Sequence, residues 1–535
     1  GTAITISGTT SYNGTYTVAN VTPTSFTITA TFFANDATGV WQLAGGMISG
    51  CSTTGNTGAI TLSNDPSRFN GVAPLAVFFD ASATTATATT KPFHDLEYRW
   101  DFDDPGSGTW ANGAQPGVSS KNSATGPVAA HVFETPGIYT VALTATDGTN
   151  TVSNSCAQIV VQDPDTVFAG SNTICIGATT TPTAGAGGCP AGATTAQESN
   201  FATAINTYAL TGRRVLFKRG DSFTAPTIGS LTRTGPGIVG AFGTGAVPVV
   251  QMGSSNGILG LSGQDTPNIS DWRIMDLEFD GLNNTSGFGI IAGGEINQVL
   301  ILNMQINDIY NGVNFNYSLL DWHNNHGHPG HAIFDQIAIV NSTITPNTAD
   351  GISTTSTSWR IYAAAQRLAI LGNTLGNVAD STAMGSHVVR TPYIGKGVIS
   401  NNTIARPGAL TATSSSGSIA IKMHAPPWCA ATSLAGECLV LDTTPTYSYL
   451  TNTAPIGVFA ATTGYTEQVV VSDNQIIGGS GPYLVVLGPQ HTLHDERVRD
   501  VIVERNWFKA GNSATQAALV VHGSEITARN NICDM

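Results

Sequence analysis

The chain has 535 residues, of which 10% are charged and 41% hydrophobic, and its net charge at neutral pH is −14. A chain this acidic is not expected to bind nucleic acid. It contains no run of about 20 apolar residues, so we expect no membrane span. Its 60 Gly residues and many small polar residues indicate an all-β, extracellular protein with many turns.

Residues 1–45 are predicted to form a small β module. Asn13–Gly14 is a hairpin signal between two runs rich in Thr, Tyr and Val. The segment resembles small modules of phage tail and bacterial surface proteins. Since neither an initiator Met nor a signal peptide precedes the first strand-like run, we expect the chain to be part of a longer one.

Residues 46–162 are predicted to form a β-sandwich. Four phrases carry the pattern, namely PLAVFFDAS at 74–82, YRWDFDD at 98–104, HVF at 131–133 and PGIYTVALTATDG at 136–148. These phrases resemble the PKD domain. The resemblance implies an extracellular spacer or adhesion module.

One position departs from the PKD pattern, which usually has Gly where this chain has Asp103. The departure produces a local acidic patch of Asp101, Asp103 and Asp104. Carboxylates grouped in this way can bind calcium, which is the one ion that we consider as a cofactor. The alternative is that the three side chains are solvated or cap a turn.

Residues 163–535 are predicted to form a right-handed parallel β-helix. A helix is expected over 199–210, where apolar residues share one face, and a strand with a turn follows at 213–223. This order resembles the N-terminal cap and first coil of secreted right-handed β-helix proteins. A capping helix is needed because the first coil would otherwise expose apolar side chains and open strand edges.

The second half of the chain repeats one phrase: alternating aliphatic residues, then Asn or a small polar residue, one further residue, and an apolar residue. The closing apolar residues are separated by 27, 38, 31, 29, 72, 32 and 24 positions, and they are Phe279, Ile306, Ile344, Leu375, Ile404, Ile476, Phe508 and Ile532. This period predicts stacked coils, and the interval of 72 fits either two coils or one coil with an insertion. The Asn side chains are predicted to form a ladder along one corner, with Asn402, Asn474 and Asn506 in line.

A solenoid aligns side chains of successive coils in rows, so a site should appear as polar residues at equivalent positions. The second strand of each coil is expected at 312–315, 350–353, 387–392, 421–426, 483–489 and 519–523. Matching the prolines of the third and fourth strands places Arg390 beside His424, with Lys422 on the same face. These three are the candidate catalytic residues. Asp350 and His387 are candidate substrate-binding residues: Asp350 is expected near the row, and alternation places His387 on the face opposite to Arg390 unless a bulge intervenes. A cationic row suits the carboxylate or sulfate of an acidic sugar. The alternative is that the two cations are solvated and the His caps a turn.

A second candidate site lies in the run 321–330, which falls within the long 38-residue interval. His323, His326 and His328 are candidate metal ligands. The alternative is a sugar-binding loop in which Trp322 and Trp359 stack on sugar rings.

The seven Cys residues suggest an oxidising compartment. Three disulfides are plausible from their placement, namely Cys51–Cys156, Cys175–Cys189 and Cys429–Cys438. Cys533 is left over, and the last phrase ends without a polar cap. We therefore expect head-to-tail assembly with a second copy of the chain as a partner.

Three functions remain open. The first is an extracellular structural or adhesive surface or fibre protein whose β-helix faces a polysaccharide or a cell-surface glycan. The second is a secreted polysaccharide lyase, which would use a basic residue to remove the proton beside a uronate carboxylate. This second hypothesis rests on an analogy with β-helix lyases. The third is a phage tail fibre or tailspike, which would be a trimer.

Overall fold

The computed structural model describes residues 3–7, 9–19, 26–35, 40–43, 45–47, 53–254, 256–262, 269–282, 287–293, 296–315, 334–345, 359–376, 387–405, 419–424, 465–478, 483–488, 497–509 and 517–534. Contacts divide the chain into two compact units. The first, here the sandwich unit, is Gly1–Gly108 with Ser120–Val167, and the second, the solenoid unit, is Thr109–Ser119 with Phe168–Met535. Whether residues 1–45 form a domain of their own stays a prediction.

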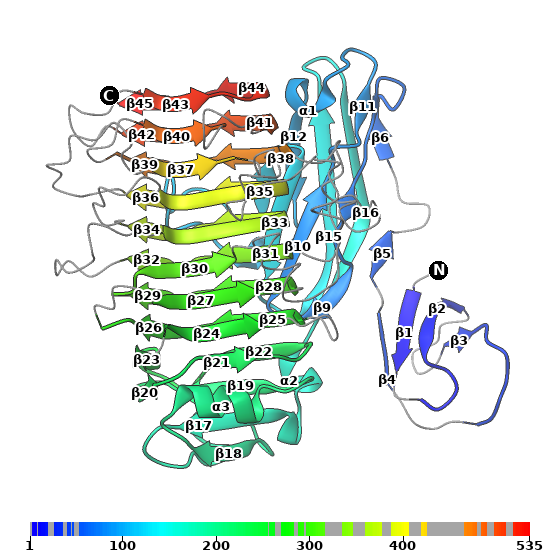
Figure 1. Cartoon of the computed structure of the whole chain (residues 1–535). Helices are drawn as coiled ribbons and strands as arrows, with labels where there is room; N and C mark the ends of the chain where they lie inside the picture. Colours follow the sequence, from blue (N-terminus) through cyan, green and yellow to red (C-terminus); the bar gives the residue numbers. More distant parts are fainter. Residues whose placement is uncertain are drawn as a thin grey trace, which may run out of the picture. The chain divides into compact units, whose positions relative to one another are not determined.

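The sandwich unit is built from mainly antiparallel sheets, in which only the described pairing of β16 with β9 is parallel (Figure 1). Its first sheet has the order β3-β2-β1-β4, with bounds Thr27–Ile28, Gly14–Ala19, Ala3–Ser7 and Val40–Leu43. Another has the order β14-β10-β8, with bounds Val128–Phe133, Leu75–Asp80 and Asp65–Pro66. A larger one follows β13-β12-β15-β16-β5, with bounds Ser123–Thr125, Glu97–Asp101, Gly137–Thr146, Thr151–Gln162 and Gly46–Met47. Its smaller elements are β6 Thr53–Gly55 and β9 Asn70–Val72, which pair with β16, then the pair β7 Ile60–Thr61 and β11 Thr85–Ala86, and the helices α1 Pro92–Asp95 and α2 Pro164–Val167.

Alternation along the strands creates the core of the sandwich. In β12 the side chains of Tyr98 and Trp100 are buried while their neighbours are exposed. Trp100 packs against Phe79 of β10 at a ring distance of 5.5 Å, and its Nε1 donates a hydrogen bond to the Gly126 carbonyl at 2.9 Å. The predicted β-sandwich is therefore confirmed.

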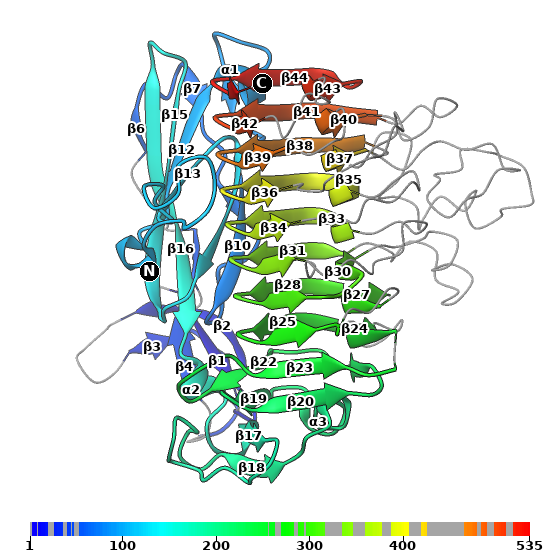
Figure 2. The ribbon, with the colours of Figure 1, turned by 90° about the vertical axis from the view of Figure 1, so that its left-hand side faces the viewer.

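The solenoid unit is a parallel β-helix with three faces, and its coils stack from green to red in Figure 2. Face 1 starts with β17 Thr173–Gly177 and β18 Thr194–Gln197 and continues through β19 Arg214–Lys218, β22 Gly237–Phe242, β25 Ile269–Met275, β28 Ile296–Leu302, β31 Asp335–Val340, β33 Trp359–Leu371, β35 His387–Ser400, β38 Tyr465–Ser472, β41 Arg497–Glu504 and β44 Ser524–Arg529. Face 2 is β20 Ser222–Ala225, β23 Val249–Met252, β26 Glu278–Asp280, β29 Gln305–Asn307, β32 Thr343–Thr345, β34 Thr374–Gly376, β36 Thr403–Ala405, β39 Gln475–Ile477, β42 Trp507–Lys509 and β45 Ile532–Asp534. Face 3 is β21 Gly229–Leu231, β24 Gly257–Ser262, β27 Phe288–Gly293, β30 Asn311–Phe315, the first parts of β33 and β35, β37 Ile419–Met423, β40 Tyr483–Leu487 and β43 Ala517–Val521. The predicted fold class is confirmed.

The closing apolar residues of the repeated phrase stack inside face 2, as predicted. Phe279 is in register with Ile306, and the column continues through each following coil to Phe508. Ile404 pairs directly with Ile476, so the interval of 72 is one coil with an insertion.

The last coil differs from the prediction, because Phe508 pairs with Cys533 and not with Ile532. In the last coil, as in the earlier ones, the inward residue lies two positions after the corner residue, which here is Asn531. Ile532 follows its corner Asn at once, so it points outward and is 61% exposed.

The corner before face 2 holds the predicted Asn ladder. The Oδ1 of Asn474 accepts hydrogen bonds from the backbone N–H and the Nδ2 of Asn402 at 3.0 and 2.9 Å. The Oδ1 of Asn506 accepts the same pair from Asn474 at 3.0 and 2.9 Å. The three side chains are buried and in line, which confirms the prediction and shows why the later coils repeat this residue.

The segment Thr109–Ser119 belongs to the solenoid unit and lies at this corner. The Nδ2 of Asn112 donates to the Gly372 carbonyl at 2.8 Å, and its Oδ1 accepts from the Thr374 hydroxyl at 2.9 Å. The ring of Trp110, 7% exposed, lies against Gly372. The segment therefore packs against the coil corner through both polar and apolar contacts.

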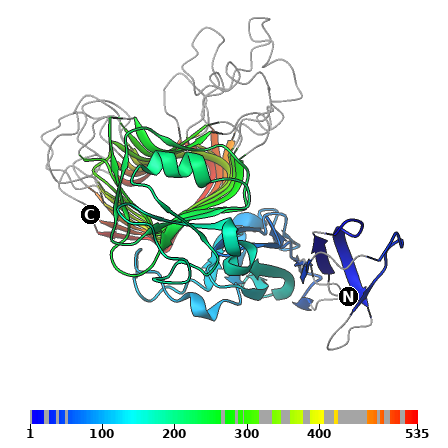
Figure 3. The ribbon, with the colours of Figure 1, turned by 90° about the horizontal axis from the view of Figure 1, so that it is seen from below.

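The first coil is capped by α3, Phe201–Tyr208, which lies across the end of the β-helix in Figure 3. The helix is shorter than predicted and begins after Asn200, whose Oδ1 accepts from the Thr203 N–H at 3.1 Å. Phe201 enters the core against Phe217 at a ring distance of 5.0 Å. In the described part of the chain, no helix has the length and hydropathy needed to cross a membrane.

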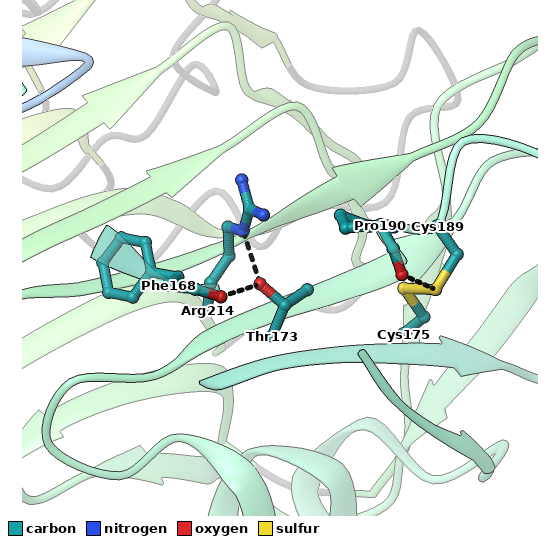
Figure 4. Close-up of a disulfide and its surroundings, with 6 residues drawn as sticks. All are labelled: Phe168, Thr173, Cys175, Cys189, Pro190 and Arg214. Atoms are coloured by element: carbon teal, nitrogen blue, oxygen red, sulfur yellow. Dashed lines mark hydrogen bonds between the residues drawn. A yellow bond between two sulfur atoms is a disulfide. The ribbon is translucent and has the colours of Figure 1, made fainter. Parts of the chain in front are cut away.

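A disulfide joins β17 to the segment before β18 at the start of the β-helix (Figure 4). Cys175 and Cys189 are joined, as predicted, with their Cα atoms 6.0 Å apart. In the same view Arg214 Nε donates to the Thr173 hydroxyl at 2.9 Å, and that hydroxyl donates to the Phe168 carbonyl at 2.8 Å. The start of the β-helix is thus held by a covalent bond and by buried polar contacts.

The other cysteines are described only in part. Cys156 takes part in a disulfide. Cys51, its predicted partner, lies outside the described residues, as do Cys429 and Cys438, so these two pairings stay predictions. Cys533 is a free and exposed thiol.

Candidate functional site

One outward row of face 3 changes its chemistry over four neighbouring coils. In chain order its members are Gly260, Ile291, Asn314, Tyr362, Arg390, Lys422, Val486 and Val520. The residues on either side of Asn314, Tyr362 and Lys422 belong to the core, so the row itself points outward. The row is aliphatic or small at both ends and polar, aromatic and cationic between them.

The four central members and two neighbours form what we call the face-3 cluster: Asn314, Trp359, Tyr362, Arg390, Lys422 and His424. The rings of Trp359 and Tyr362 lie 4.7 Å apart at an angle of 46°. The Arg390 guanidinium lies 5.1 Å from the centre of the Tyr362 ring and 5.8 Å from that of Trp359. The guanidinium carbon therefore lies over both aromatic rings, in cation–π contact.

The cationic side of the cluster is held by polar contacts. Arg390 Nε donates a hydrogen bond to Nε2 of His424 at 3.3 Å, which requires a neutral imidazole with its proton on Nδ1. Lys422 Nζ donates to the Gly488 carbonyl at 3.0 Å. Arg390 and Lys422 are each 5% exposed and His424 is 0% exposed. The dielectric constant is low in such a buried environment, so these cations attract a negative group more strongly than they would at an open surface.

The predicted register of these strands is wrong by two positions. Arg390, Lys422 and His424 nevertheless lie close together. Arg390 is in register with Lys422 and not with His424. The register of β33 and β35 shifts between Tyr362 and Ala364, so β35 contains a bulge around Pro392. A proline in a bulge is a poor marker for aligning coils.

Sequence reasoning missed Tyr362 and Asn314. The strand that pairs with β30 in the next coil starts at Trp359, whereas it was expected at 350–353. Tyr362 was therefore not among the residues that the sequence analysis matched from coil to coil. The signal that identifies it is alternation with the core residues Ile361 and Ala363.

The remaining predicted site residues divide into two groups. His387 and Trp359 are the first residues of β35 and β33 and are in register with each other. The others lie outside the described residues: Trp322, His323, His326, His328 and Asp350. Metal binding by the three His residues therefore stays a prediction.

The acidic turn of the sandwich unit uses its carboxylates in local contacts. Asp101 Oδ1 accepts from the Asp103 N–H and from Asn122 Nδ2, each at 3.0 Å. Asp103 Oδ2 accepts from the Thr140 N–H at 2.9 Å, and Asp104 Oδ2 lies 3.0 Å from His131 Nε2. Asp103 has φ of 60°, which explains why Gly is usual there and why Asp is tolerated.

These contacts favour turn capping over ion binding. Within the described ranges, no group of three or more His, Cys, Asp or Glu side chains is placed to hold a metal ion. Calcium binding at Asp101, Asp103 and Asp104 stays a prediction.

We expect acid to destabilise the sandwich unit through His131. Burial lowers the pKa of His131 from its ordinary value of 6.5, and the hydrogen bond to Asp104 opposes this only in part. Below about pH 6.5 the unfolded chain binds a proton that the folded sandwich excludes, so the free energy of unfolding falls as the pH is lowered through that range. Hydrogen exchange of β14, corrected for intrinsic rates, should rise from about pH 7 to about pH 5.

The matched variant is His131→Gln, which keeps a polar partner for Asp104 but does not titrate. Its exchange in β14 should depend less on pH than that of the wild type. Equal pH dependence in both proteins would contradict the role of His131.

The chain is similar to one known domain family over part of the sandwich unit. The model of the PKD domain family matches residues 73–162. The predicted resemblance of the sandwich is confirmed over this segment. No curated protein sequence matches the chain.

Solved structures with a similar fold are distant. A GH136 lacto-N-biosidase from Eubacterium ramulus is 11% identical, with 67% of this chain and 68% of that chain covered and a TM-score of 0.27. The A-module of a mannuronan C-5 epimerase from Azotobacter vinelandii is 11% identical, with 60% and 88% covered and a TM-score of 0.23. A tailspike protein from Pseudomonas phage LKA1 is 9% identical, with 92% and 64% covered and a TM-score of 0.26. Scores this low carry no argument about the function of this chain.

Proposed function

We propose that this chain is an extracellular, carbohydrate-binding surface protein and that the face-3 cluster binds an acidic glycan. The observation that carries the proposal is the change of the outward row over four coils, from aliphatic residues to Asn, Tyr, Arg and Lys. An extracellular location is supported by the Cys175–Cys189 disulfide and by the match to the PKD domain family. Assembly of copies into a fibre stays a prediction.

The chemistry of the cluster suits a sugar that carries a carboxylate or a sulfate. A guanidinium and an ammonium group can each form a charge-assisted hydrogen bond with such an oxygen. The ring of Trp359 is half-buried and can offer an apolar face to a sugar ring, whereas Tyr362 is buried and packs behind Trp359 and Arg390. Only 10% of the residues are charged and the net charge is −14. Arg390 and Lys422 are in register on adjacent coils and are both buried, whereas another pair of cations in register, Arg367 and Lys396, is only half-buried.

The test is calorimetric titration of the full chain with polygalacturonate, alginate and chondroitin sulfate, with dextran as a neutral control. We expect binding to at least one of the acidic polymers. Arg390→Ala and Lys422→Ala should each weaken it by about tenfold or more, because each removes a charged hydrogen-bond donor.

The matched control is Lys396→Ala, which removes a cation from the same strand as Arg390 but outside the cluster. It should bind as the wild type does. Loss of binding in the control alone, or unchanged binding in Arg390→Ala and Lys422→Ala, would contradict the proposal.

One contact favours lyase activity as a second candidate function. Nε2 of His424 is the ring nitrogen that would take a proton, and it lies within 3.3 Å of Arg390 Nε, so it could act as the base once Arg390 turns from the ring to a bound carboxylate. In the reaction the base takes the proton on C5 of a uronate, the C4–O bond breaks, and the leaving oxygen is protonated. The product carries a C4–C5 double bond that absorbs ultraviolet light, and the cations would stabilise the carboxylate during proton removal.

Lyase activity is tested by following ultraviolet absorbance during incubation with the same acidic polymers. A rise that His424→Ala abolishes, in a variant that still binds the polymer, would favour the enzyme. Binding without any rise in absorbance would leave the binding protein as the function.

A further inference from the structure

Two strands of the face-3 cluster start in an unusual way, because a side chain of the preceding coil accepts their first amide. The N–H of Trp359 donates to Asn311 Oδ1 at 2.8 Å. The N–H of Ile419 donates to His387 Nδ1 at 3.2 Å. In an earlier coil the same position uses a backbone acceptor, since the N–H of Asn311 donates to the Gly287 carbonyl at 3.0 Å.

The four residues occupy one column of face 3. Trp359 is in register with His387, and His387 with Ile419. The pairing of Val313 with Ile361 places Asn311 at the same level, two residues earlier in each strand. Asn311 and His387 are therefore equivalent residues on alternate coils, and each holds the start of the strand above it.

The strands held in this way carry the cluster. Asn311 holds β33, which supplies Trp359 and Tyr362, and His387 holds β37, which supplies Lys422. Strand ends open more easily than strand centres, so a bond to the first amide limits this opening. Lys422 lies three residues after Ile419, so its position depends directly on that bond.

We infer that Asn311 and His387 are positioning residues for the face-3 cluster, an inference that rests on the proposed function. His387 was predicted to contact substrate, whereas its Nδ1 accepts the amide of β37. The chemical requirement is a side-chain acceptor at this position. The chain itself shows that Asn can meet this requirement, because Asn311 does so at the equivalent level.

The experiment compares the full chain with His387→Leu and His387→Asn, and uses the exposed His522→Leu as the matched control. Hydrogen exchange is measured over 419–423, and affinity is measured with the acidic polymer that the wild type binds. His387→Leu should raise exchange in this segment by about tenfold and weaken binding by a similar factor, since it removes the acceptor of a buried backbone amide. His387→Asn should restore both quantities, and His522→Leu should change neither.

The outcomes separate the two claims. Unchanged exchange in His387→Leu, or no rescue by His387→Asn, would overturn the role of the His387 bond. Raised exchange with unchanged affinity would show that the bond holds β37 without positioning the cluster, and it would also overturn the inference. If the wild type binds none of the polymers, the proposed function fails, and exchange alone decides whether His387 holds β37.

Asn311 provides a parallel test that needs no ligand. Asn311→Leu should raise exchange at the start of β33 and weaken the near-ultraviolet circular dichroism of the Trp359–Tyr362 pair. Asn311→His should recover part of both signals, because a ring nitrogen can accept the amide as it does in the equivalent coil. Unchanged exchange and dichroism in Asn311→Leu would overturn the role of Asn311.

Discussion

Replacing Asn474 with Ala is expected to lower the free energy of unfolding of the solenoid by about 2–4 kcal/mol. The side chain bonds in both directions along the ladder. Its Oδ1 accepts from the Asn402 N–H, and its Nδ2 donates to the Ile399 carbonyl at 2.8 Å. The substitution removes both partners, and a buried backbone group without a partner costs about 1–3 kcal/mol. Denaturant unfolding of the full chain measures the loss.

Gln475→Ala is the control for this prediction. Gln475 is the next residue, its side chain is half-buried on the outer side of face 2, and its backbone bond to the Asn402 carbonyl remains. Its effect should stay below about 0.5 kcal/mol, as for most surface substitutions. A similar loss in both variants would mean that the ladder does not contribute in the way we describe.

Replacing Gly372 with Asn is expected to be strongly destabilising as long as Trp110 is present. Gly372 has φ of 66°, and the equivalent residues Asn341 and Asn401 have φ of 50° and 56°. Asn is therefore acceptable to the backbone at this corner. A Cβ at position 372, however, would overlap the indole ring of Trp110. Steric overlap in a packed contact of this kind costs about 1–3 kcal/mol.

A double-mutant cycle isolates this contact. Trp110→Ala alone removes a buried ring, and Gly372→Asn alone creates the overlap. In the double variant the added side chain has room, so the losses should not add, and the coupling energy should be about 1–3 kcal/mol. Additive losses in denaturant unfolding would contradict the steric explanation. This pairing also explains why one Gly interrupts a row that is otherwise Asn or Asp from position 303 to position 473.

Much of the fold was predictable because one physical constraint acts on every coil. Each coil must turn the same corner, place an apolar residue in the core and pair its edge with the next coil, so the residue pattern repeats. This is why the sequence alone predicted that Asn402, Asn474 and Asn506 lie in line. It is also why the repeated phrase can be recognised again at Ile476, after the insertion that follows Ile404.

The candidate site was harder to predict, because its register depends on local irregularities. The bulge around Pro392 makes this proline a poor marker for the register of Arg390, and long intervals between repeated phrases leave the start of the next strand undefined. Tyr362 follows from alternation only once Trp359 is known to start β33. The hydrogen bonds of Asn311 and His387 leave no distinct pattern in the sequence, since neither residue type is unusual at a strand start.

The direct pairing of β36 with β39 separates two properties of the chain that are usually linked. The rise from one coil to the next is set by strand pairing, whereas the number of residues in a coil is not, since this coil spans 72 positions and its neighbour 29. The entropy cost of closing a longer loop grows only slowly with its length. Inserts between faces can therefore be exchanged, lengthened or removed during evolution while the scaffold stays in register, so new ligand preferences can arise without a new fold.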